Sequence, residues 1–389
     1  MNEAPCLQQP LQAQAVDVLI WARIRANKRG SFEAYLQATA EQCLAQGLSV
    51  AIVVVEKTRP ELLEQFNRVG VSVYEMPAEC WVSPAVLKRV LTVFQPRIVH
   101  FHFYSVVSPL WAAAQRFGAK VYLSAHSSLP DPSLEHEPNA FAEWLRRIRR
   151  SYFARKVDRF LPVSEFLAED LRSASRVHGT RITTIPNGVD CERFAPVNAE
   201  QRRLLRQHFY LHPDKPVIAF VGQIETHKGI VDFCEAMQRM STERDFQVVI
   251  AGAGAQLSSL IERYPQWRWL GSVDSVEKVL AASDILVCPS RWQEAFGLVI
   301  AEAQACGVPV LGSNRGGIPE VIADQETGYL IPAANPDAIC QRISDLLNNT
   351  ALREQMSRAA RDRALSLFSL DQQVERTVDL YRQDLAVVA

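Results

Sequence analysis

The sequence predicts an α/β protein made of two doubly wound domains, each with a parallel sheet covered by helices on both faces. Short apolar runs alternate with amphipathic segments along the chain, which is typical of βαβ units. This rhythm occurs twice, before and after a polar, charged stretch at 198–216. The length of 389 residues also favours two or three domains over one.

The first half begins with an apolar run at 17–21, which is typical of a buried strand. Apolar residues then recur at spacings of three and four over 32–44, as expected of a helix with one buried face. Ser31 is the expected N-cap of this helix, and Gly47 its expected end. Further strands are expected at the apolar runs 48–55, 98–101 and 121–124.

The second half repeats the pattern after the polar stretch, which we interpret as the connection between domains. We therefore expect an N-terminal domain at 1–197 and a C-terminal domain at 198–370. A last helix at 371–389 is expected to return to the N-terminal domain, after a break near Ser369. Ligands of such sheets bind at the carboxyl ends of the strands. The strands of this half are expected at 217–221, 247–251, 284–289 and 308–311.

The composition is that of a soluble globular protein, with 48% hydrophobic and 22% charged residues. A formal net charge of −1 gives no field that would attract nucleic acid, so no such partner is expected. None of the 8 cysteines has Cys-x-x-Cys spacing, which argues against a zinc ribbon and favours a reducing compartment. No signal peptide or apolar span is recognised, so a cytoplasmic protein is expected.

The most informative segment is 289–309, which places two glutamates around an expected helix start. Glu302 lies among apolar residues, where a carboxylate is costly unless it meets donors such as ribose hydroxyls. Backbone amides near Gly297 would stabilise a phosphate at the helix N-terminus. Glu294, just outside the helix, could accept hydrogen bonds from sugar hydroxyls. The alternative is that Glu294 caps the helix and Glu302 pairs with a surface arginine.

The flanks of this segment resemble the Glu-x7-Glu signature of retaining glycosyltransferases of the GT-B fold, in particular family 4 (glycosyl transferases group 1). The segment 220–229 is similar to the Gly-Arg-x4-Lys-Gly loop of that family, whose Arg and Lys bind the donor diphosphate. Lys228 matches this Lys, and an ammonium at such a turn is a suitable phosphate partner. Gln223 stands at the position of the Arg; it keeps a donor but removes a cation.

Other segments resemble the family in order along the chain. Gly30 stands where the family has a glycine loop after the first strand, and His126 matches its active-site histidine. His100 and His102 alternate along a strand and are interpreted as packing residues. Turns of the family are also matched at 163–166, 185–190, 251–254 and 316–320. In the first of these turns, Ser164 is the expected cap of a helix.

The resemblance implies two facing Rossmann-like domains with a cleft between them, the donor being held by the C-terminal one and the acceptor by the N-terminal one. It implies transfer from a nucleotide-diphosphate sugar, UDP-linked, with retention at the anomeric carbon. No Asp-x-Asp pair occurs in the chain, which fits a metal-independent site without a cofactor. The resemblance implies catalytic roles for His126, Lys228 and Glu294. The donor-binding residues it implies are Gly30, Gly222, Gln223, Lys228, Glu294, Phe296, Gly297, Leu298, Val299 and Glu302.

Two alternatives to sugar transfer stay open. One is another chemistry of the same fold, a nucleotide-sugar epimerase or a phosphorylase, and the other is a non-catalytic sugar-binding subunit. The acceptor is expected to be a glycan, a lipid-linked molecule or a small molecule. The basic and aromatic stretch at Arg146–Arg150 suggests peripheral contact with the inner face of a membrane, and the alternative is a solvated helix face.

Overall fold

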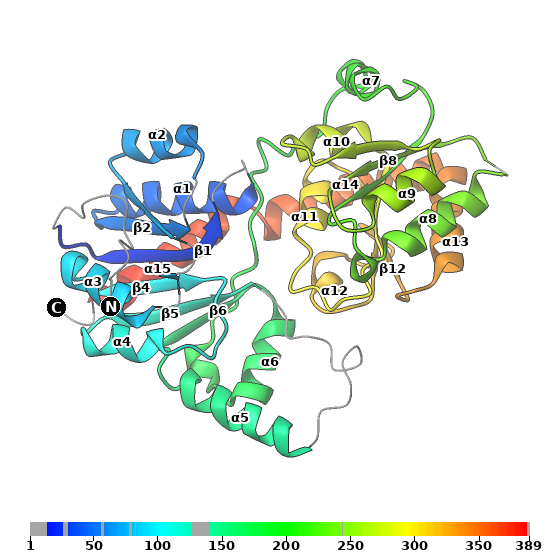
Figure 1. Cartoon of the computed structure of the whole chain (residues 1–389). Helices are drawn as coiled ribbons and strands as arrows, with labels where there is room; N and C mark the ends of the chain where they lie inside the picture. The colour runs from blue at the N-terminus through cyan, green and yellow to red at the C-terminus, as the bar shows by residue number, and fades with distance from the viewer. Residues whose placement is uncertain are drawn as a thin grey trace. The chain divides into compact units, whose positions relative to one another are not determined.

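The chain forms two compact units, Met1–Gly188 with Asp371–Ala389, and Val189–Leu370. The domain boundary predicted from the sequence, between 197 and 198, lies nine residues after the boundary between these units at Gly188 and Val189. The computed structural model describes residues 14–25, 30–55, 58–77, 80–81, 83–126, 140–242 and 244–386. Each unit is built around its own sheet (Figure 1).

The first unit contains a six-stranded sheet in which every pairing is parallel, in the order β3-β2-β1-β4-β5-β6. From β1 the chain adds strands first on one side of the sheet and then, from β4, on the other. The boundary between β1 and β4 is therefore the switch point of a doubly wound sheet. This confirms the predicted α/β fold for the first half. The strands are β1 (Val18–Arg25), β2 (Val50–Val55), β3 (Ser72–Met76), β4 (Ile98–His102), β5 (Lys120–Ala125) and β6 (Arg159–Pro162).

Helices connect these strands, and the first of them begins one residue earlier than predicted, at the predicted cap residue itself. Gly30 is the N-cap and Ser31 the first helical residue, because the carbonyl of Gly30 accepts the first helical hydrogen bond from Ala34 at 3.1 Å. Ser164 caps its helix as predicted, accepting from the Leu167 amide at 3.2 Å. The helices are α1 (Ser31–Ala45), α2 (Pro60–Arg68), α3 (Pro84–Phe94), α4 (Leu110–Arg116), α5 (Ala140–Ala154), α6 (Glu165–Ser175), η2 (Gly179–Arg181) and α15 (Leu370–Ala386).

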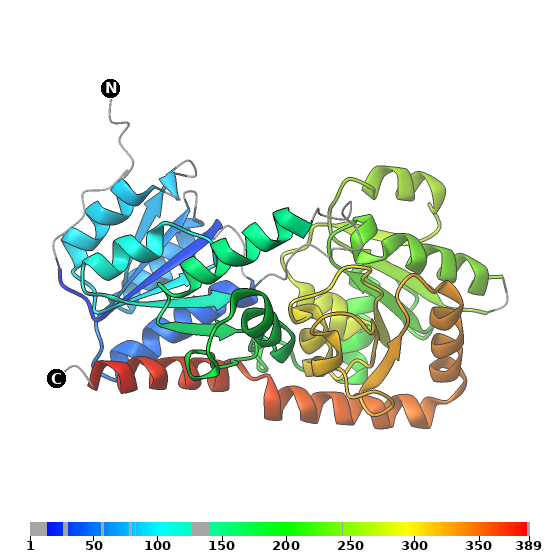
Figure 2. The same cartoon turned by 90° about the horizontal axis from the view of Figure 1, so that it is seen from below.

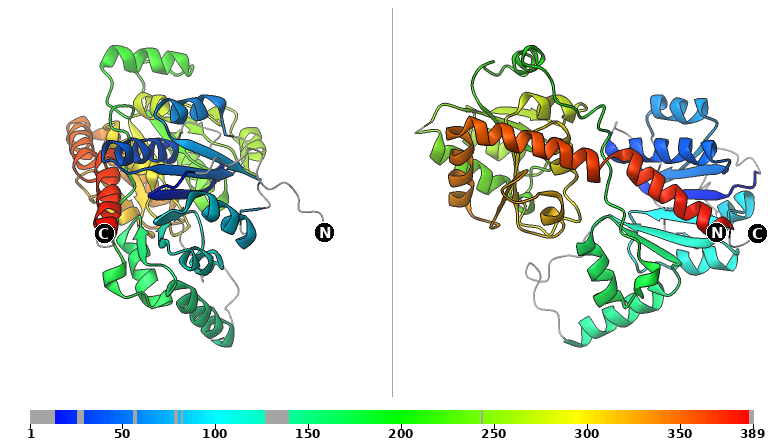
Figure 3. Two further views of the ribbon diagram at one scale, coloured as in Figure 1. Left: turned by 90° about the vertical axis from the view of Figure 1, so that its left-hand side faces the viewer. Right: turned by 180° about the vertical axis from the view of Figure 1, so that it is seen from behind.

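The C-terminal helix α15 packs along the first unit (Figures 2 and 3). Tyr381 on this helix is fully buried. Asp384, one turn later, accepts two hydrogen bonds from Arg159 at 2.6 and 2.8 Å and one from the Tyr122 hydroxyl at 2.5 Å. A carboxylate and a guanidinium in this bidentate geometry fix α15 against β5 and β6.

This anchor makes stability depend on acid pH. The Arg159 guanidinium lowers the pKa of Asp384 from 3.8 to about 2. A carboxyl whose pKa is lower when folded stabilises the fold above its unfolded pKa and loses that contribution as pH falls. We therefore expect about 1 kcal/mol of stability to disappear between about pH 4 and pH 2, after allowance for water at the pair.

Urea denaturation across this pH range tests the expectation. Asp384→Asn should remove the pH-dependent part, whereas Asp379→Asn on the same helix should not, because its contact with Arg382 is 3.7 Å long and half exposed. An unchanged pH profile in Asp384→Asn would contradict the assignment.

The second unit repeats the architecture, with parallel strands in the order β12-β11-β10-β7-β8-β9. Its switch point lies between β7 and β10. Its strands are β7 (Val217–Val221), β8 (Gln247–Ala251), β9 (Arg268–Gly271), β10 (Ile285–Cys288), β11 (Val310–Ser313) and β12 (Gly328–Ile331). Its helices are α7 (Ala199–His208), η3 (Thr226–Lys228), α8 (Ile230–Met240), α9 (Leu257–Arg263), α10 (Val276–Ala282), α11 (Leu298–Ala305), α12 (Ile318–Val321), α13 (Pro336–Asn348) and α14 (Thr350–Leu367).

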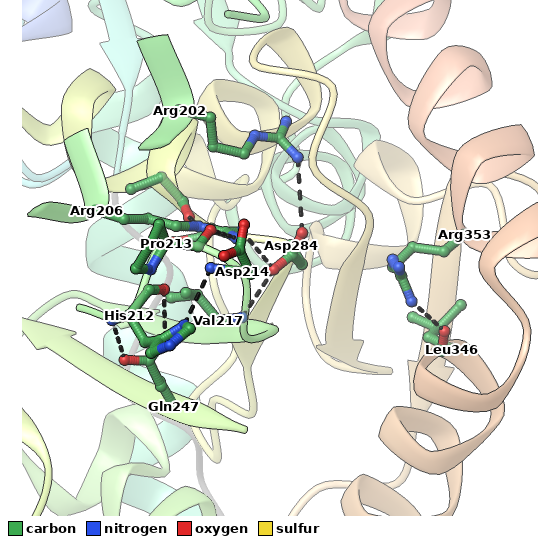
Figure 4. Close-up of polar contacts among 12 residues, drawn as sticks. Arg202, Arg206, His212, Pro213, Asp214, Val217, Gln247, Asp284, Leu346 and Arg353 are labelled. Atoms are coloured by element: carbon green, nitrogen blue, oxygen red, sulfur yellow. Dashed lines mark hydrogen bonds and ion pairs between the residues drawn. The ribbon is translucent and has the colours of Figure 1, made fainter. Parts of the chain in front are cut away.

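The polar stretch interpreted as an inter-domain connection is largely the helix α7, and it belongs to the second unit. The interpretation was wrong because Asn198 and Gln201 form a capping box, which starts a helix despite the polar composition. Arg206 fastens α7 to the sheet: it donates to Asp284 at 2.7 Å, and the same carboxylate oxygen accepts from the Val217 amide at 2.7 Å (Figure 4).

Asp284→Asn is expected to lower the free energy of unfolding by about 3 kcal/mol, because it leaves the buried Arg206 guanidinium without its counter-charge. The Arg206 side chain is only 7% exposed and that of Asp284 13%. Urea denaturation measures the change. Asp245→Asn is the matched control, since its pair with Lys215 has a similar length of 2.8 Å but Asp245 is 73% exposed. This change should have little effect on stability.

Candidate functional site

The predicted donor residues of the second unit gather at its switch point, where the adjacent parallel strands β7 and β10 end. Gly222 and Gln223 follow β7, and the loop carrying Glu294 follows β10. The two segments meet through an ion pair, in which Lys228 Nζ lies 2.6 Å from Glu294 Oε1. Two residues predicted separately to bind phosphate and sugar are therefore direct neighbours.

The Glu294 carboxylate is held from two sides. Its Oε1 accepts a second hydrogen bond, from the Ser290 hydroxyl at 2.7 Å, and the Ser290 carbonyl in turn accepts from the Ser313 hydroxyl at 2.6 Å. Among the described residues, Glu294 Oε2 accepts no hydrogen bond. One oxygen is therefore fixed by the protein and the other is available to a hydroxyl group.

The backbone around Glu294 is fixed by a pair of glycines. The Gly317 amide donates to the Glu294 carbonyl at 2.7 Å. Gly316 has a φ of 58°, and a Cβ placed on it would lie 2.2 Å from the Glu294 carbonyl oxygen. A side chain at this position would displace the loop, so the turn matched at 316–320 directly supports the candidate site.

Lys228 reaches Glu294 because two turns approach closely. Gly229, the next residue, has a φ of 74°, and a Cβ on it would stand 2.0 Å from the Pro289 carbonyl oxygen. The amides of Arg291 and Trp292 donate to the His227 carbonyl at 2.9 and 3.1 Å. These backbone contacts join the β7–α8 turn to the β10–α11 loop before any side chain contributes.

A second ion pair at the same place was missed by the sequence analysis. Arg291 donates to both carboxylate oxygens of Asp232, on α8, at 2.8 and 2.6 Å. These hydrogen bonds raise the pKa of the Arg291 guanidinium. Arg291 was visible only as a charge in a loop, and Asp232 only as a polar residue in a helix. Their contact depends on the fold, and it fixes the loop that carries Glu294.

The helix α11 begins directly after this loop. Gly297 is its N-cap, with a φ of 96° that favours glycine. The amides of Leu298 and Val299 lie in the first turn, where helical amides have no partner within the helix. Such an end stabilises an anion.

The remaining predicted donor residues differ in exposure. Phe296 is buried, with its ring edge-on to Phe368 at 5.4 Å. Glu302, within α11, is also buried, at 9% exposed. The Gln223 side chain is exposed at the end of β7. A glutamine there is thus placed to meet a ligand from solvent.

In the first unit, His126 follows β5 and belongs to a cluster of aromatic rings. Its Nε2 lies 3.0 Å from Nδ1 of His102. Phe103 stacks on it, with ring centroids 4.4 Å apart, and adopts the left-handed φ of 62°, which is rare for a bulky residue. Burial lowers the pKa of His126 to about 3, so the ring is neutral at physiological pH.

The interpretation of His102 as a packing residue missed this hydrogen bond. His102 is indeed fully buried, as is His100, but it also contacts a predicted site residue. The signal was present in the pattern: β4 and β5 pair in parallel with His102 opposite Ser124, so a residue just after β5 lies within reach of the end of β4.

Two further predicted features have their place in the first unit. Gly30 is the N-cap of α1 with a φ of −94°, a value that any residue adopts. Arg146–Arg150 lie on α5, where Arg150 donates to Asp170 at 2.7 Å and so ties this helix to α6. Within the described ranges no group of three or more His, Cys, Asp or Glu side chains is arranged to hold a metal ion. None of the described helices has both the length and the apolar composition needed to cross a membrane.

Comparison with known proteins gives two matches to family models. Residues 201–363 match the model of glycosyl transferases group 1, and residues 32–193 match that of glycosyltransferase family 4. The first match covers the Lys228 turn and the Glu294 loop, and the second covers His126.

Curated relatives and solved structures agree with these matches. The chain is 29% identical over 296 residues to the D-inositol 3-phosphate glycosyltransferase of Mycobacteroides abscessus, covering 72% of this chain and 65% of that protein. It is 27% identical over 311 residues to the alpha-maltose-1-phosphate synthase of Mycolicibacterium smegmatis, covering 74% of this chain and 79% of that protein. Thus the chain spans about two thirds of the length of the first relative.

The fold is also similar to the crystal structure of Anabaena Alr3699/HepE in complex with UDP. The TM-score is 0.75 at 18% identity, covering 93% of this chain and 99% of that one. Together the two family matches span most of the sequence, and the chain therefore belongs to the GT-B glycosyltransferases of family 4 and group 1.

Proposed function

We propose that the chain transfers a sugar from a UDP-linked donor to an acceptor, with retention at the anomeric carbon. The observation that carries this proposal is the contact between Lys228 and Glu294 at the switch point of the second unit. This contact places a cation suited to a diphosphate next to a carboxylate suited to sugar hydroxyls. The first turn of α11 follows directly along the chain. The UDP preference is supported by the nucleotide named in the related Anabaena structure.

Each residue then has a role. Lys228, assisted by Gln223 and by the amides of Leu298 and Val299, neutralises the diphosphate in place of a metal ion. Glu294 orients the sugar through Oε2. In the first unit, His126 hydrogen-bonds an oxygen of the substrate. The remaining donor contacts are Glu302 to the ribose and the backbone at Gly30, Gly222, Phe296 and Gly297.

The transfer itself is a displacement on one face of the sugar. The bond between the anomeric carbon and the diphosphate oxygen breaks while the acceptor oxygen bonds to the same carbon. The acceptor proton passes to the departing diphosphate, so UDP leaves and the anomeric configuration is retained. Charge grows on the leaving oxygen, where Lys228 and the helix amides stabilise it.

A donor panel tests the proposal. Thermal-shift titration with UDP-, GDP- and ADP-sugars should show stabilisation by a UDP-sugar, and UDP should be released only when an acceptor is added. Conversion of the donor sugar to its epimer without acceptor would instead establish an epimerase, and sugar 1-phosphate formed with inorganic phosphate a phosphorylase. Stabilisation without any turnover would establish a binding subunit. NMR of the anomeric proton in the product decides retention.

We also infer that the protein works in the cytoplasm and contacts the inner face of a membrane through α5. Five large hydrophobic side chains on this helix are exposed, and their spacing places them on one face: Phe141, Trp144, Leu145, Ile148 and Tyr152. The helix also carries four arginines and one glutamate. An exposed apolar face beside positive charge is complementary to anionic lipid. Arg150 is largely buried and held by Asp170. Arg146 and Arg147 pair with Glu143 at exposed positions, so these two arginines and Arg149 supply the lipid contacts.

Co-sedimentation with vesicles tests this contact. The protein should bind vesicles containing phosphatidylglycerol, bind pure phosphatidylcholine weakly, and dissociate at high salt. The double variant Trp144→Ser/Ile148→Ser should lose binding. Tyr210→Ser is the matched control, because Tyr210 is 82% exposed but lies in the second unit. Equal binding by the double variant and the control would refute the role of α5.

A further inference from the structure

The histidine cluster of the first unit contains a hydrogen bond between two imidazole rings. His102, at the end of β4, is fully buried, and its Nδ1 lies 3.0 Å from Nε2 of His126. The other nitrogen of His102, Nε2, is buried with no hydrogen-bond partner in the described part of the chain. His102 therefore has one nitrogen that is satisfied and one that is not.

Both rings are neutral, which restricts how they share a proton. Burial lowers the pKa of both His102 and His126. The nearby rings of His100 and His126 lower the pKa of His102 further. A neutral imidazole has one N–H donor and one bare acceptor nitrogen. Either His102 Nδ1 donates to His126 Nε2, or His126 Nε2 donates to His102 Nδ1.

The unsatisfied nitrogen distinguishes the two arrangements. If His126 donated, His102 would carry its proton on Nε2, and an N–H group would be buried without an acceptor. Leaving a buried donor unsatisfied costs about 1–3 kcal/mol, and orphaned N–H groups are rarer in folded proteins than under-used acceptors. If His102 donates, its Nε2 is a bare acceptor. The arrangement in which His102 Nδ1 donates to His126 Nε2 is therefore the favoured one.

We propose that His102 is a positioning residue that holds His126 as the tautomer protonated on Nδ1. With Nε2 occupied as an acceptor, the Nδ1–H of His126 is a hydrogen-bond donor, and no described residue accepts from it. A donor at this position suits a sugar hydroxyl or a phosphate oxygen of the substrate. This role deepens the proposed function and rests on it, since it names how His126 meets the donor molecule.

The surrounding rings fix the same orientation. Phe103 stacks on His126, and Phe32 contacts it edge-on at 5.4 Å. His100 cannot replace His102 as the partner, because its own nitrogens bond to the Tyr381 hydroxyl and to the Ser124 hydroxyl. The left-handed backbone of Phe103 immediately after His102 is the strained conformation that brings its ring onto His126.

NMR of the full-length protein labelled with ¹⁵N in histidine tests the tautomer directly. We expect His126 to show an Nδ1-protonated ring that does not titrate between pH 6 and pH 8. A ring protonated on Nε2 would overturn the proposal. This readout needs no substrate, so it separates failure of the tautomer assignment from failure of the proposed transferase activity.

Two variants of His102 test its positioning role. Asparagine keeps an N–H group near the place of Nδ1, whereas leucine has a similar size and no donor. His102→Leu should release the tautomer of His126 and lower kcat about tenfold, with the acceptor KM nearly unchanged. His102→Asn should keep both the tautomer of His126 and the parental kcat. Equal kcat and equal spectra in folded Leu and Asn variants would refute the role.

Discussion

Replacing Glu294 by alanine is expected to reduce sugar transfer by about 10³-fold while the protein stays folded. The carboxylate lies in the loop after β10, with Oε1 held by Lys228 and Ser290. Its removal takes away the acceptor that we propose orients the sugar. It also leaves Lys228 without its carboxylate, but this side chain is 24% exposed and can be solvated. The loss should therefore fall on kcat more than on stability.

A graded series separates charge from hydrogen bonding at this position. Glu294→Gln keeps an oxygen that accepts from Ser290 and Lys228, so it should retain more activity than alanine. Glu235→Ala on α8 is the matched control, since it removes an exposed glutamate paired with Arg239 in the same unit. Initial rates at saturating donor and a thermal melt of each variant give the comparison. If Glu294→Ala and Glu302→Ala both transferred sugar at the parental rate, the site would be wrongly assigned.

The fold was predictable because its signals are local. Apolar runs of four to eight residues marked strands such as β7 and β10, and three- and four-residue spacing marked α1. The polar helix α7 escaped because composition was weighed above its capping box. The ion pair of Arg291 with Asp232 was not predicted for another reason. The partners are 59 residues apart, and the sequence around one residue does not indicate that it contacts the other.

The candidate site was predictable only in part, for a related reason. Lys228 and Glu294 were found through motifs on separate segments, and their direct contact follows from the adjacency of β7 and β10. The hydrogen bond of His102 with His126 depends likewise on the pairing of β4 and β5. The residues predicted to touch the ligand carry motifs. The residues that position them depend on strand order, which a periodic pattern does not specify.

Lys228→Ala is expected to lower kcat by about 10²-fold or more, because it removes the cation that we propose neutralises the departing diphosphate. Lys215→Ala is the matched control, since Lys215 also pairs with a carboxylate in the second unit but at an exposed position. Lys228→Arg should recover part of the rate. Activity equal to that of Lys215→Ala would exclude Lys228 from the chemistry.

The ion pair itself leads to a less obvious consequence for UDP binding. Without a ligand, the Lys228 ammonium is held by Glu294 at 2.6 Å, so a diphosphate has to compete with this carboxylate. Glu294→Gln removes the competing charge. It should therefore bind UDP, which has no sugar to be oriented, at least as tightly as the parent, while it transfers sugar more slowly. Calorimetric titration with UDP measures the dissociation constant.

A double variant tests whether Lys228 and Glu294 act through one contact. Lys228→Ala should weaken UDP binding, and in the Lys228→Ala background Glu294→Gln should no longer strengthen it. Weaker UDP binding by Glu294→Gln would mean that the carboxylate supports the phosphate site rather than competing with it.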